Sequence, residues 1–284
     1  MSKLRQQMLR EMQLRHYSPR TITHYIGALI SISKYYNQSP ADLSIDQIKD
    51  YLHYLIETKH ASRALVNHII SALKLLWEGV LRREWKDMQI KRPRTSRELP
   101  VVFSKMEVNK LLSMTRNLKH RTCLSVGYSA GLRISEVCYL KPGDIDRSRM
   151  QIRVYHGKGS KTRYVPLANG ILTLLDDYIR FYPNQQYLFE GNKNGYPIAR
   201  TTLGVIFRQA LKRAEIKKEA TFHTLRHSYA THLLEQGVNL KIIQQLLGHT
   251  SLRTTSIYFH VQDVSSLKIK SPFDTLQTEA NEQI

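Results

Sequence analysis

Cysteine is scarce in this 284-residue sequence, and long apolar runs are missing from it. Cys123 and Cys138 are its two cysteines, and both stand among apolar neighbours. Such a pair forms no disulfide framework and no cysteine-based zinc site, which favours a reducing, cytoplasmic setting. No run of 18 apolar residues occurs, so we predict no membrane-spanning helix. The N-terminal segment has no apolar core, and we therefore expect no secretory signal.

Acidic side chains are few relative to basic ones. Asp and Glu number 23 against 43 Lys and Arg, which gives a net charge of +20 and a pI near 10.0. This excess points to a polyanionic partner, most simply nucleic acid, although solubility or an acidic membrane would also account for it. Residues 1–95 hold 16 basic against 8 acidic residues, and the remainder holds 27 against 15. Both parts of the chain can therefore contact phosphates.

Residues 1–90 show a helical pattern with clear start signals. Ser18 followed by Pro19 predicts the start of one helix, and Ser44 with Gln47 fits a capping box at the start of another. Apolar residues recur at helical spacing through these segments, and no strand pattern or internal repeat is found. We predict four helices with short connections, which make a small all-α unit.

The segment 91–100, KRPRTSRELP, predicts a linker because it is basic, contains two prolines and lacks periodicity. It is either a solvated spacer or a strap that lies on a nucleic-acid backbone, and the charge of the chain favours the strap. The side chains expected to contact the nucleic acid, in this segment and farther along the chain, are Lys91, Arg92, Arg94, Lys161 and Arg163.

The sequence beyond the linker mixes helices with one pair of strands. Met150–Tyr155 and Thr162–Leu167 carry alternating, β-branched and aromatic residues, which predict two strands of a hairpin. Two glycines flank Lys158 between them and make a tight tip, which by itself reads as a basic turn in solvent. Helices are expected on both sides of this hairpin. The predicted fold class is mainly α with a small antiparallel β-sheet.

The stretch 220–261 concentrates side chains suited to phosphate chemistry. His223 and Arg226 are three residues apart, so on a helix they share one face. Gly248 and His249 follow an apolar run and look like a helix stop, and Tyr258 lies nine residues beyond His249. Arg matches phosphate oxygens, His can move protons and Tyr can attack, so their convergence would make a site for a phosphate.

These motifs resemble those of the tyrosine recombinases, the phage-integrase and Xer-like family. The pattern stands here as His223-Thr-Leu-Arg226, Leu-Gly-His249 and Tyr258, with Arg133 in GLRISEV and Lys158 in GKGSKTRYVPL. The resemblance implies a helical core-binding, SAM-like domain over 1–90, the linker 91–100, and an α+β catalytic domain with a C-terminal tail over 101–284. It covers the chain from about residue 104 to 261, and the N-terminal helices more loosely.

The same resemblance implies what the site does. The expected activity is site-specific cutting and rejoining of duplex DNA through a covalent 3′-phosphotyrosyl intermediate and a Holliday junction in a homotetramer, without metal, ATP or another cofactor. The implied catalytic residues are Arg133, Lys158, His223, Arg226, His249 and Tyr258.

Physical chemistry suggests a role for each of them. The two arginines would stabilise charge on the equatorial oxygens, and His249 would donate a further hydrogen bond. Tyr258 would be the nucleophile, His223 its base and Lys158 the acid for the departing 5′-oxygen. Glu136 would orient Arg133, although an Arg-x-x-Glu pair is usually a surface ion pair.

Three alternatives remain open at this point. His223, His227 and His249 would also suit a metal-dependent nuclease, but acidic ligands are sparse nearby. A regulatory protein on a decayed recombinase scaffold and a type IB topoisomerase are the other two.

His227 and His232 are interpreted as structural, and so are Tyr155, Tyr164 and Tyr229. Within the family, the C-terminal tail and the segment 117–121 resemble those of integron- and transposon-associated integrases. The 65 positions from Lys158 to His223 are too few for the insertion that integron integrases carry, which favours an Xer-like or mobile-element integrase acting on duplex sites.

Overall fold

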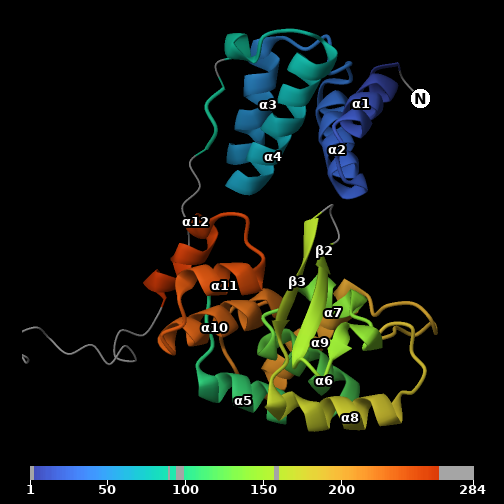
Figure 1. The fold of residues 1–284 in the computed structure, drawn as a ribbon. Coiled ribbons are helices and arrows are strands. Elements are labelled where there is room, and N and C mark those ends of the chain that lie inside the picture. The colour runs from blue at the N-terminus through green and yellow to red at the C-terminus, as the bar shows by residue number, and fades with distance from the viewer. Residues whose placement is uncertain (1–2, 89, 94–98, 157–159, 262–284) are drawn as a thin grey trace, which may run out of the picture. The chain divides into compact units, whose positions relative to one another are not determined.

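The structure is a computed structural model that describes residues 3–88, 90–93, 99–156 and 160–261. The chain divides into two compact units, Met1–Arg97 and Glu98–Ile284 (Figure 1). Each unit has its own apolar core. The predicted domain limits at residues 90 and 101 stay predictions. No helix among the described residues is both long and apolar enough to cross a membrane.

All the regular elements in the described part of the first unit are helices. Its elements are α1 (Lys3–Leu14), α2 (Pro19–Tyr36), α3 (Ile45–Glu57), α4 (Arg63–Lys74), a π-helical turn η1 (Leu75–Val80) and a 3₁₀ turn η2 (Trp85–Met88). The Ser18 side chain accepts a hydrogen bond from the Thr21 amide, with Pro19 in the first turn, as predicted. Ser44 and Gln47 form the predicted capping box of α3. Serine side chains thus cap the N-termini of α2 and α3, as the local sequence predicts. The four α-helices bury Met8, Ile32, Ile48 and Leu73 in their core.

The second unit packs helices around a small antiparallel sheet. Its elements are α5 (Lys105–Ser113), α6 (Leu118–Ser129), α7 (Ile134–Tyr139), η3 (Pro142–Asp144), β1 (Ile145–Asp146), β2 (Gln151–His156), β3 (Ser160–Pro166), η4 (Asn169–Ile171), α8 (Leu172–Phe181), α9 (Arg200–Arg213), α10 (Phe222–Glu235), α11 (Leu240–Leu247), α12 (Leu252–Thr255) and η5 (Ser256–His260). The predicted fold class, mainly α with a small antiparallel sheet, is confirmed. Strand β1 was not predicted, because two residues carry no alternation.

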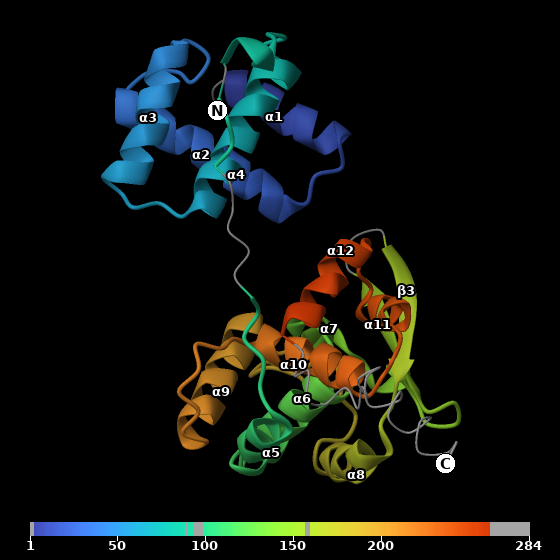
Figure 2. The ribbon, with the colours of Figure 1, turned by 90° about the vertical axis from the view of Figure 1, so that its left-hand side faces the viewer.

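The hairpin pairs Ile152 with Val165 and Arg153 with Tyr164. Ile152, Val154 and Val165 are buried, while Tyr164 is exposed. The apolar and polar residues that alternate in the sequence therefore lie on a buried and a solvent-exposed face of the hairpin. Strand β3 contacts α11. In Figures 1 and 2, β2, β3 and α12 reach one end of this unit, and α5 and α8 lie at the other.

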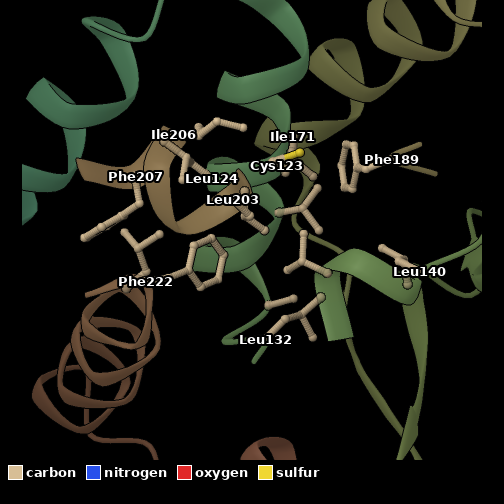
Figure 3. Close-up of a cluster of buried hydrophobic side chains, with 14 of the residues drawn as sticks. Cys123, Leu124, Leu132, Leu140, Ile171, Phe189, Leu203, Ile206, Phe207 and Phe222 are labelled. Atoms are coloured by element: carbon tan, nitrogen blue, oxygen red, sulfur yellow. The ribbon is translucent and has the colours of Figure 1, made fainter. Parts of the chain in front are cut away.

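The core of the second unit is built around α6 (Figure 3). Cys123 and Leu124 on α6 meet Leu203 and Phe207 of α9 and Phe222 of α10. Both cysteines are free and buried. Burial raises the pKa of the Cys138 thiol to about 11, so it packs as a small apolar group. This core seats α10 firmly, and α10 carries much of the chemistry described below.

Gly131, in the turn after α6, is a position where close packing against Tyr229 requires glycine. Its φ is +58°, and a Cβ there would lie 2.4 Å from Cδ1 of Tyr229. We predict that Gly131→Ala destabilises the protein by about 2 kcal/mol or more, because left-handed strain and overpacking add. Thermal unfolding tests this. Gly204→Ala is the matched control, because a Cβ at Gly204 meets nothing within 4 Å and α9 should gain helix propensity.

Candidate active site

Glu136 is the centre of a buried cluster of arginines. Arg133 Nη1 donates to Glu136 Oε1 at 2.8 Å, and the Arg133 amide donates to Oε2 at 2.8 Å. The two terminal nitrogens of Arg163 donate to the two carboxylate oxygens, each at 2.8 Å. Arg226 Nη1 lies 3.7 Å from Oε2. One carboxylate therefore faces three guanidinium groups, which leaves the cluster strongly cationic. The predicted pairing of Glu136 with Arg133 is present.

The pKa of the Glu136 carboxyl reflects this arrangement. Burial by itself would raise that pKa, but the hydrogen bonds and charge of Arg163, the Arg133 amide and the charge of Arg226 lower it to about 2. The carboxylate is therefore ionised at neutral pH. Because buried carboxylates are costly without partners, the three arginines and Glu136 hold one another in place.

Arg226 is the most deeply buried member of the cluster, at 1% exposure. Its Nη1 donates to the Gly131 carbonyl at 2.8 Å, and its Nη2 donates to the carbonyl of Leu247. These contacts bring the turn after α6 and the end of α11 to α10. Burial, opposed by Glu136, lowers the Arg226 pKa to about 9, and the positive charge of Arg133 adds to this lowering. Arg226 is thus a cation fixed in position.

Arg133 is the more accessible of the two arginines predicted to clamp a phosphate. Its side chain is 27% exposed, and its Nη2 donates to the Gly248 carbonyl at 3.3 Å. Arg133 stands at the N-terminal cap of α7, where its backbone turns the chain into the helix. An anion reaching this cluster would meet Arg133 before the buried Arg226.

His249 is held by the turn that follows α11. Gly248 adopts the left-handed conformation at the end of α11, with φ 63°, as the predicted helix stop requires. His249 Nδ1 lies 2.9 Å from Thr255 Oγ1, and Thr255 is buried. Burial and the charges of Arg226 and Arg133 lower the pKa of His249 to about 3. The imidazole is therefore neutral at neutral pH.

Tyr258 reaches the same site from η5. It is 1% exposed, and its hydroxyl lies 3.1 Å from His227 Nδ1 on α10. Burial raises the Tyr258 pKa, and the charges of Arg226 and Arg133 oppose that rise without cancelling it. Both guanidinium groups therefore lie within electrostatic reach of the hydroxyl. In the structure as it stands, the phenol is protonated at neutral pH.

His223 lies one helical turn before His227. Its side chain is only partly exposed, and its ring centre lies 5.9 Å from that of His227 in an edge-to-face arrangement. Partial burial and the charges of Arg226 and Arg133 lower the pKa of His223. Among the described residues, His223 has no hydrogen bond to Tyr258. The structure thus gathers Arg133, Arg226, His249, Tyr258 and the His223–His227 pair in one place.

Two features of the site were missed from the sequence. Arg163 was expected to contact DNA, but its side chain is 9% exposed and its Nε donates to the Leu246 carbonyl at 2.7 Å. Arg163 shares the inward face of β3 with Val165, and this alternation was the available signal. His227 was interpreted as structural, yet it contacts the Tyr258 hydroxyl. Because His227 follows His223 by four residues, the two share one face of α10, and this spacing could have indicated that His227 also faces the site.

The other residues predicted to act in catalysis or to contact DNA lie outside the described residues or at the ends of described segments. Lys158 and Arg94 lie outside the described residues, and the structure describes no side-chain surroundings for Lys161. Lys91 and Arg92 are exposed, and Arg92 Nη2 donates to Ser71 Oγ on α4 at 3.1 Å. The contacts with DNA predicted for these residues stay predictions.

His223, His227 and His249 lie in one site, and three histidines can hold a metal ion if their geometry allows it. Across residues 3–88, 90–93, 99–156 and 160–261, no group of three or more His, Cys, Asp or Glu side chains is placed to hold a metal ion. The Glu136 carboxylate of this site is engaged by arginines.

Comparison with known proteins identifies the family. Residues 102–264 match the model of the phage integrase family, and residues 4–87 match the phage integrase N-terminal SAM-like domain. The chain belongs to the phage integrase family. This membership confirms the family predicted from the sequence and, with it, the class of enzyme, a tyrosine-type site-specific recombinase.

Relatives and solved structures agree with this membership. The chain is 37% identical to a putative integrase/recombinase of Sinorhizobium fredii, over 99% of this chain and 91% of the relative. It is 34% identical to the tyrosine recombinase XerA of Pyrococcus horikoshii, over 88% of this chain and 86% of the relative. A crystal structure of the XerH recombinase bound to its difH substrate superposes with a TM-score of 0.73 at 23% identity, over 93% of this chain and 82% of that one.

Arg163 allows a test of how this family member holds its arginines. We predict that Arg163→Met destabilises the protein by about 3 kcal/mol, because it removes both hydrogen bonds of one guanidinium to a buried carboxylate. Arg163→Lys should lose less stability but still fail to make the two-pronged contact. Thermal unfolding and DNA cleavage under saturating DNA measure both effects. Unchanged cleavage in Arg163→Met would show that Arg133 and Arg226 do not depend on this contact. Arg153→Met, at a half-exposed arginine paired with Asp144, is the control.

The depressed histidine pKa values predict acid lability. An unfolded chain binds protons near the ordinary value of 6.5, whereas folded His227 does so near 4 and His249 near 3. Stability contributed by these neutral imidazoles is therefore complete above pH 6.5 and decreases as pH falls toward these values. Melting temperatures measured across this range should decline less steeply in His227→Gln and His249→Gln than in the wild type. Equal slopes in all three proteins would contradict the prediction.

Proposed function

We propose that this protein cuts one strand of duplex DNA with the Tyr258 hydroxyl and rejoins it to a new partner at a specific site. The observation that carries the proposal is the position of that hydroxyl, which lies beside an imidazole and within electrostatic reach of two arginines that share one carboxylate. The structure of the relative XerH, bound to its difH substrate after cleavage, supports DNA as the partner.

The arginines supply the electrostatic part of the reaction. Glu136 neutralises one of the three positive charges around it, so about two remain for an incoming phosphodiester and its transition state. Because the guanidinium groups are already fixed by carbonyls and by Glu136, little reorganisation is needed when negative charge grows on the equatorial oxygens. The exposed edge of Arg133 is the natural point of first contact.

His249 is suited to donate a hydrogen bond to the same phosphate. If the Thr255 hydroxyl donates to Nδ1, the ring proton resides on Nε2, which is then a donor on the opposite edge. A neutral imidazole can stabilise a developing oxyanion without repelling the nearby arginines.

The attack conserves the energy of the broken bond. The Tyr258 oxygen forms a bond to phosphorus, the bond to the 5′-oxygen breaks, and the 3′-phosphate stays attached to the protein. A 5′-hydroxyl from another strand then reverses the step, so neither ATP nor a metal ion is required by this chemistry. Lys158 is proposed as the acid for the departing 5′-oxygen. Two rounds of exchange through a Holliday junction in a homotetramer would complete recombination.

A covalent-capture experiment tests this function. The probe is a pool of nicked duplexes of random sequence, in which the short cleaved fragment diffuses away and traps the protein on the DNA. We predict that the wild type forms adducts in the presence of a chelator, that Tyr258→Phe forms none, and that Tyr258→Phe still binds the recovered DNA. Tyr164→Phe, at an exposed tyrosine on β3, is the control and should behave as the wild type.

The outcomes separate the alternatives. Cutting that depends on magnesium and leaves no adduct would favour a metal-dependent nuclease. Recovered adducts that share no sequence would favour a topoisomerase, because relaxation of supercoils needs no specific site. Binding without any adduct would favour a regulatory protein. Adducts with a shared sequence, made by Tyr258 in the presence of a chelator, support the proposal.

A further inference from the structure

We propose that His227 is a further catalytic residue, which accepts the proton of the Tyr258 hydroxyl as that oxygen attacks phosphorus. The inference rests on the proposed function and deepens it. The sequence predicts His223 for this role, because His223 occupies the motif position. The structure instead brings the neighbouring imidazole on α10 to the reacting oxygen.

The contact has the geometry of a hydrogen bond between the imidazole and the phenol. His227 Nδ1 and Tyr258 Oη are 3.1 Å apart, and the two rings are tilted by 52° with their centres 5.8 Å apart. Within the described parts of the chain, no other side chain makes a hydrogen bond to this hydroxyl. In the tautomer with its proton on Nε2, His227 offers the Nδ1 lone pair to the phenol. A candidate base must first reach the proton, and His227 meets that condition.

The surroundings of His227 keep its imidazole neutral. It is part-buried near the middle of α10, with His223 one turn before it and Arg226 adjacent in sequence. His249, from the turn after α11, is also within electrostatic reach. Burial, His223 and Arg226 lower the pKa of His227 to about 4. A neutral imidazole can accept a proton, whereas a protonated one would compete with the arginines for the phosphate.

A weak base is sufficient at this position. The phenol holds its proton tightly before attack, but that proton becomes strongly acidic as the oxygen forms its bond to phosphorus. In the step, the Tyr258 O–H bond breaks and a His227 N–H bond forms, while the O–P bond forms and the P–O5′ bond breaks. The departing 5′-oxygen takes a proton from a separate acid or from solvent. The negative charge of the bound phosphate also favours the imidazolium that results.

The rival role is that of a latch. The same hydrogen bond could hold Tyr258 buried until DNA arrives, and its loss would then speed cleavage. The proton-acceptor role makes the opposite prediction, so direction alone distinguishes the two. A purely structural role for His227 is tested by comparing it with a second histidine–tyrosine contact made by α10. His232 makes an analogous contact, its Nδ1 lying 2.9 Å from the Tyr128 hydroxyl, away from the arginine cluster.

The decisive variant is His227→Asn. An asparagine side-chain oxygen can accept the hydrogen bond in place of Nδ1, but it cannot carry the proton. We predict single-turnover cleavage of the recovered nicked duplex about 100-fold slower than in the wild type, a typical loss for a general base. DNA binding and melting temperature should stay close to those of the wild type. His232→Asn and Tyr128→Phe should cleave at the wild-type rate, and His223→Asn should slow cleavage less than His227→Asn does.

Two further measurements identify the missing step as proton acceptance. Added imidazole should restore part of the rate to His227→Gly and none to Tyr258→Phe. A duplex with a bridging 5′-sulfur, whose thiolate leaves without a proton, should leave the His227→Asn defect intact, because that variant lacks the base and not the acid.

The results separate this inference from the proposed function. If the wild type forms no covalent adduct, the proposed function fails. If the wild type forms adducts and His227→Asn cleaves as fast or faster, the proposed function stands and His227 is at most a latch. If His223→Asn shows the larger defect together with imidazole rescue in His223→Gly, the base is His223.

Discussion

The carboxylate of Glu136 is the constraint on which the rest of the site depends. Three guanidinium groups from α7, β3 and α10 converge on it, and such a convergence would be strongly repulsive without a negative charge at its centre. With the carboxylate present, Arg226 can be almost fully buried and Arg133 can stay partly open to solvent. The cost of burying charge is offset by this pairing, and an incoming phosphate meets donors that are already in position.

The same interaction joins parts of the chain that are distant in sequence. Arg163 joins the hairpin to α7 and, through the Leu246 carbonyl, to α11. Arg226 joins the turn at Gly131 to the end of α11, and the next turn carries His249. The hairpin and α11 are therefore placed relative to one carboxylate, and η5, which bears Tyr258, meets α10 through the contact between Tyr258 and His227. A change at Arg163 is expected to reach the chemistry although its side chain is largely buried.

Two histidine–tyrosine pairs on α10 show how similar contacts can differ in consequence. His232 and Tyr128 lie away from the arginines, and their hydrogen bond satisfies two part-buried polar groups. His227 and Tyr258 form the same kind of bond, but there the positive charges of Arg226 and Arg133 act on the phenol. The environment of a contact, and not the contact itself, makes one tyrosine a candidate nucleophile.

Local signals were enough to predict much of this protein. Helix starts at Ser18 and Ser44, the hairpin of β2 and β3 and the stop at Gly248 follow from backbone and capping preferences that act over a few residues. The family motifs likewise named the arginines, two histidines and Tyr258. Which imidazole touches the phenol depended on the long-range packing of α10 against η5. Whether Arg163 faces DNA or Glu136 depended on the tertiary approach of the hairpin and α7, which brings its guanidinium to that carboxylate. Spacing in the sequence determines which residues share one face of a helix or strand, because the backbone period is fixed locally. Only the tertiary structure determines which other residues that face contacts, because those contacts come from distant parts of the chain.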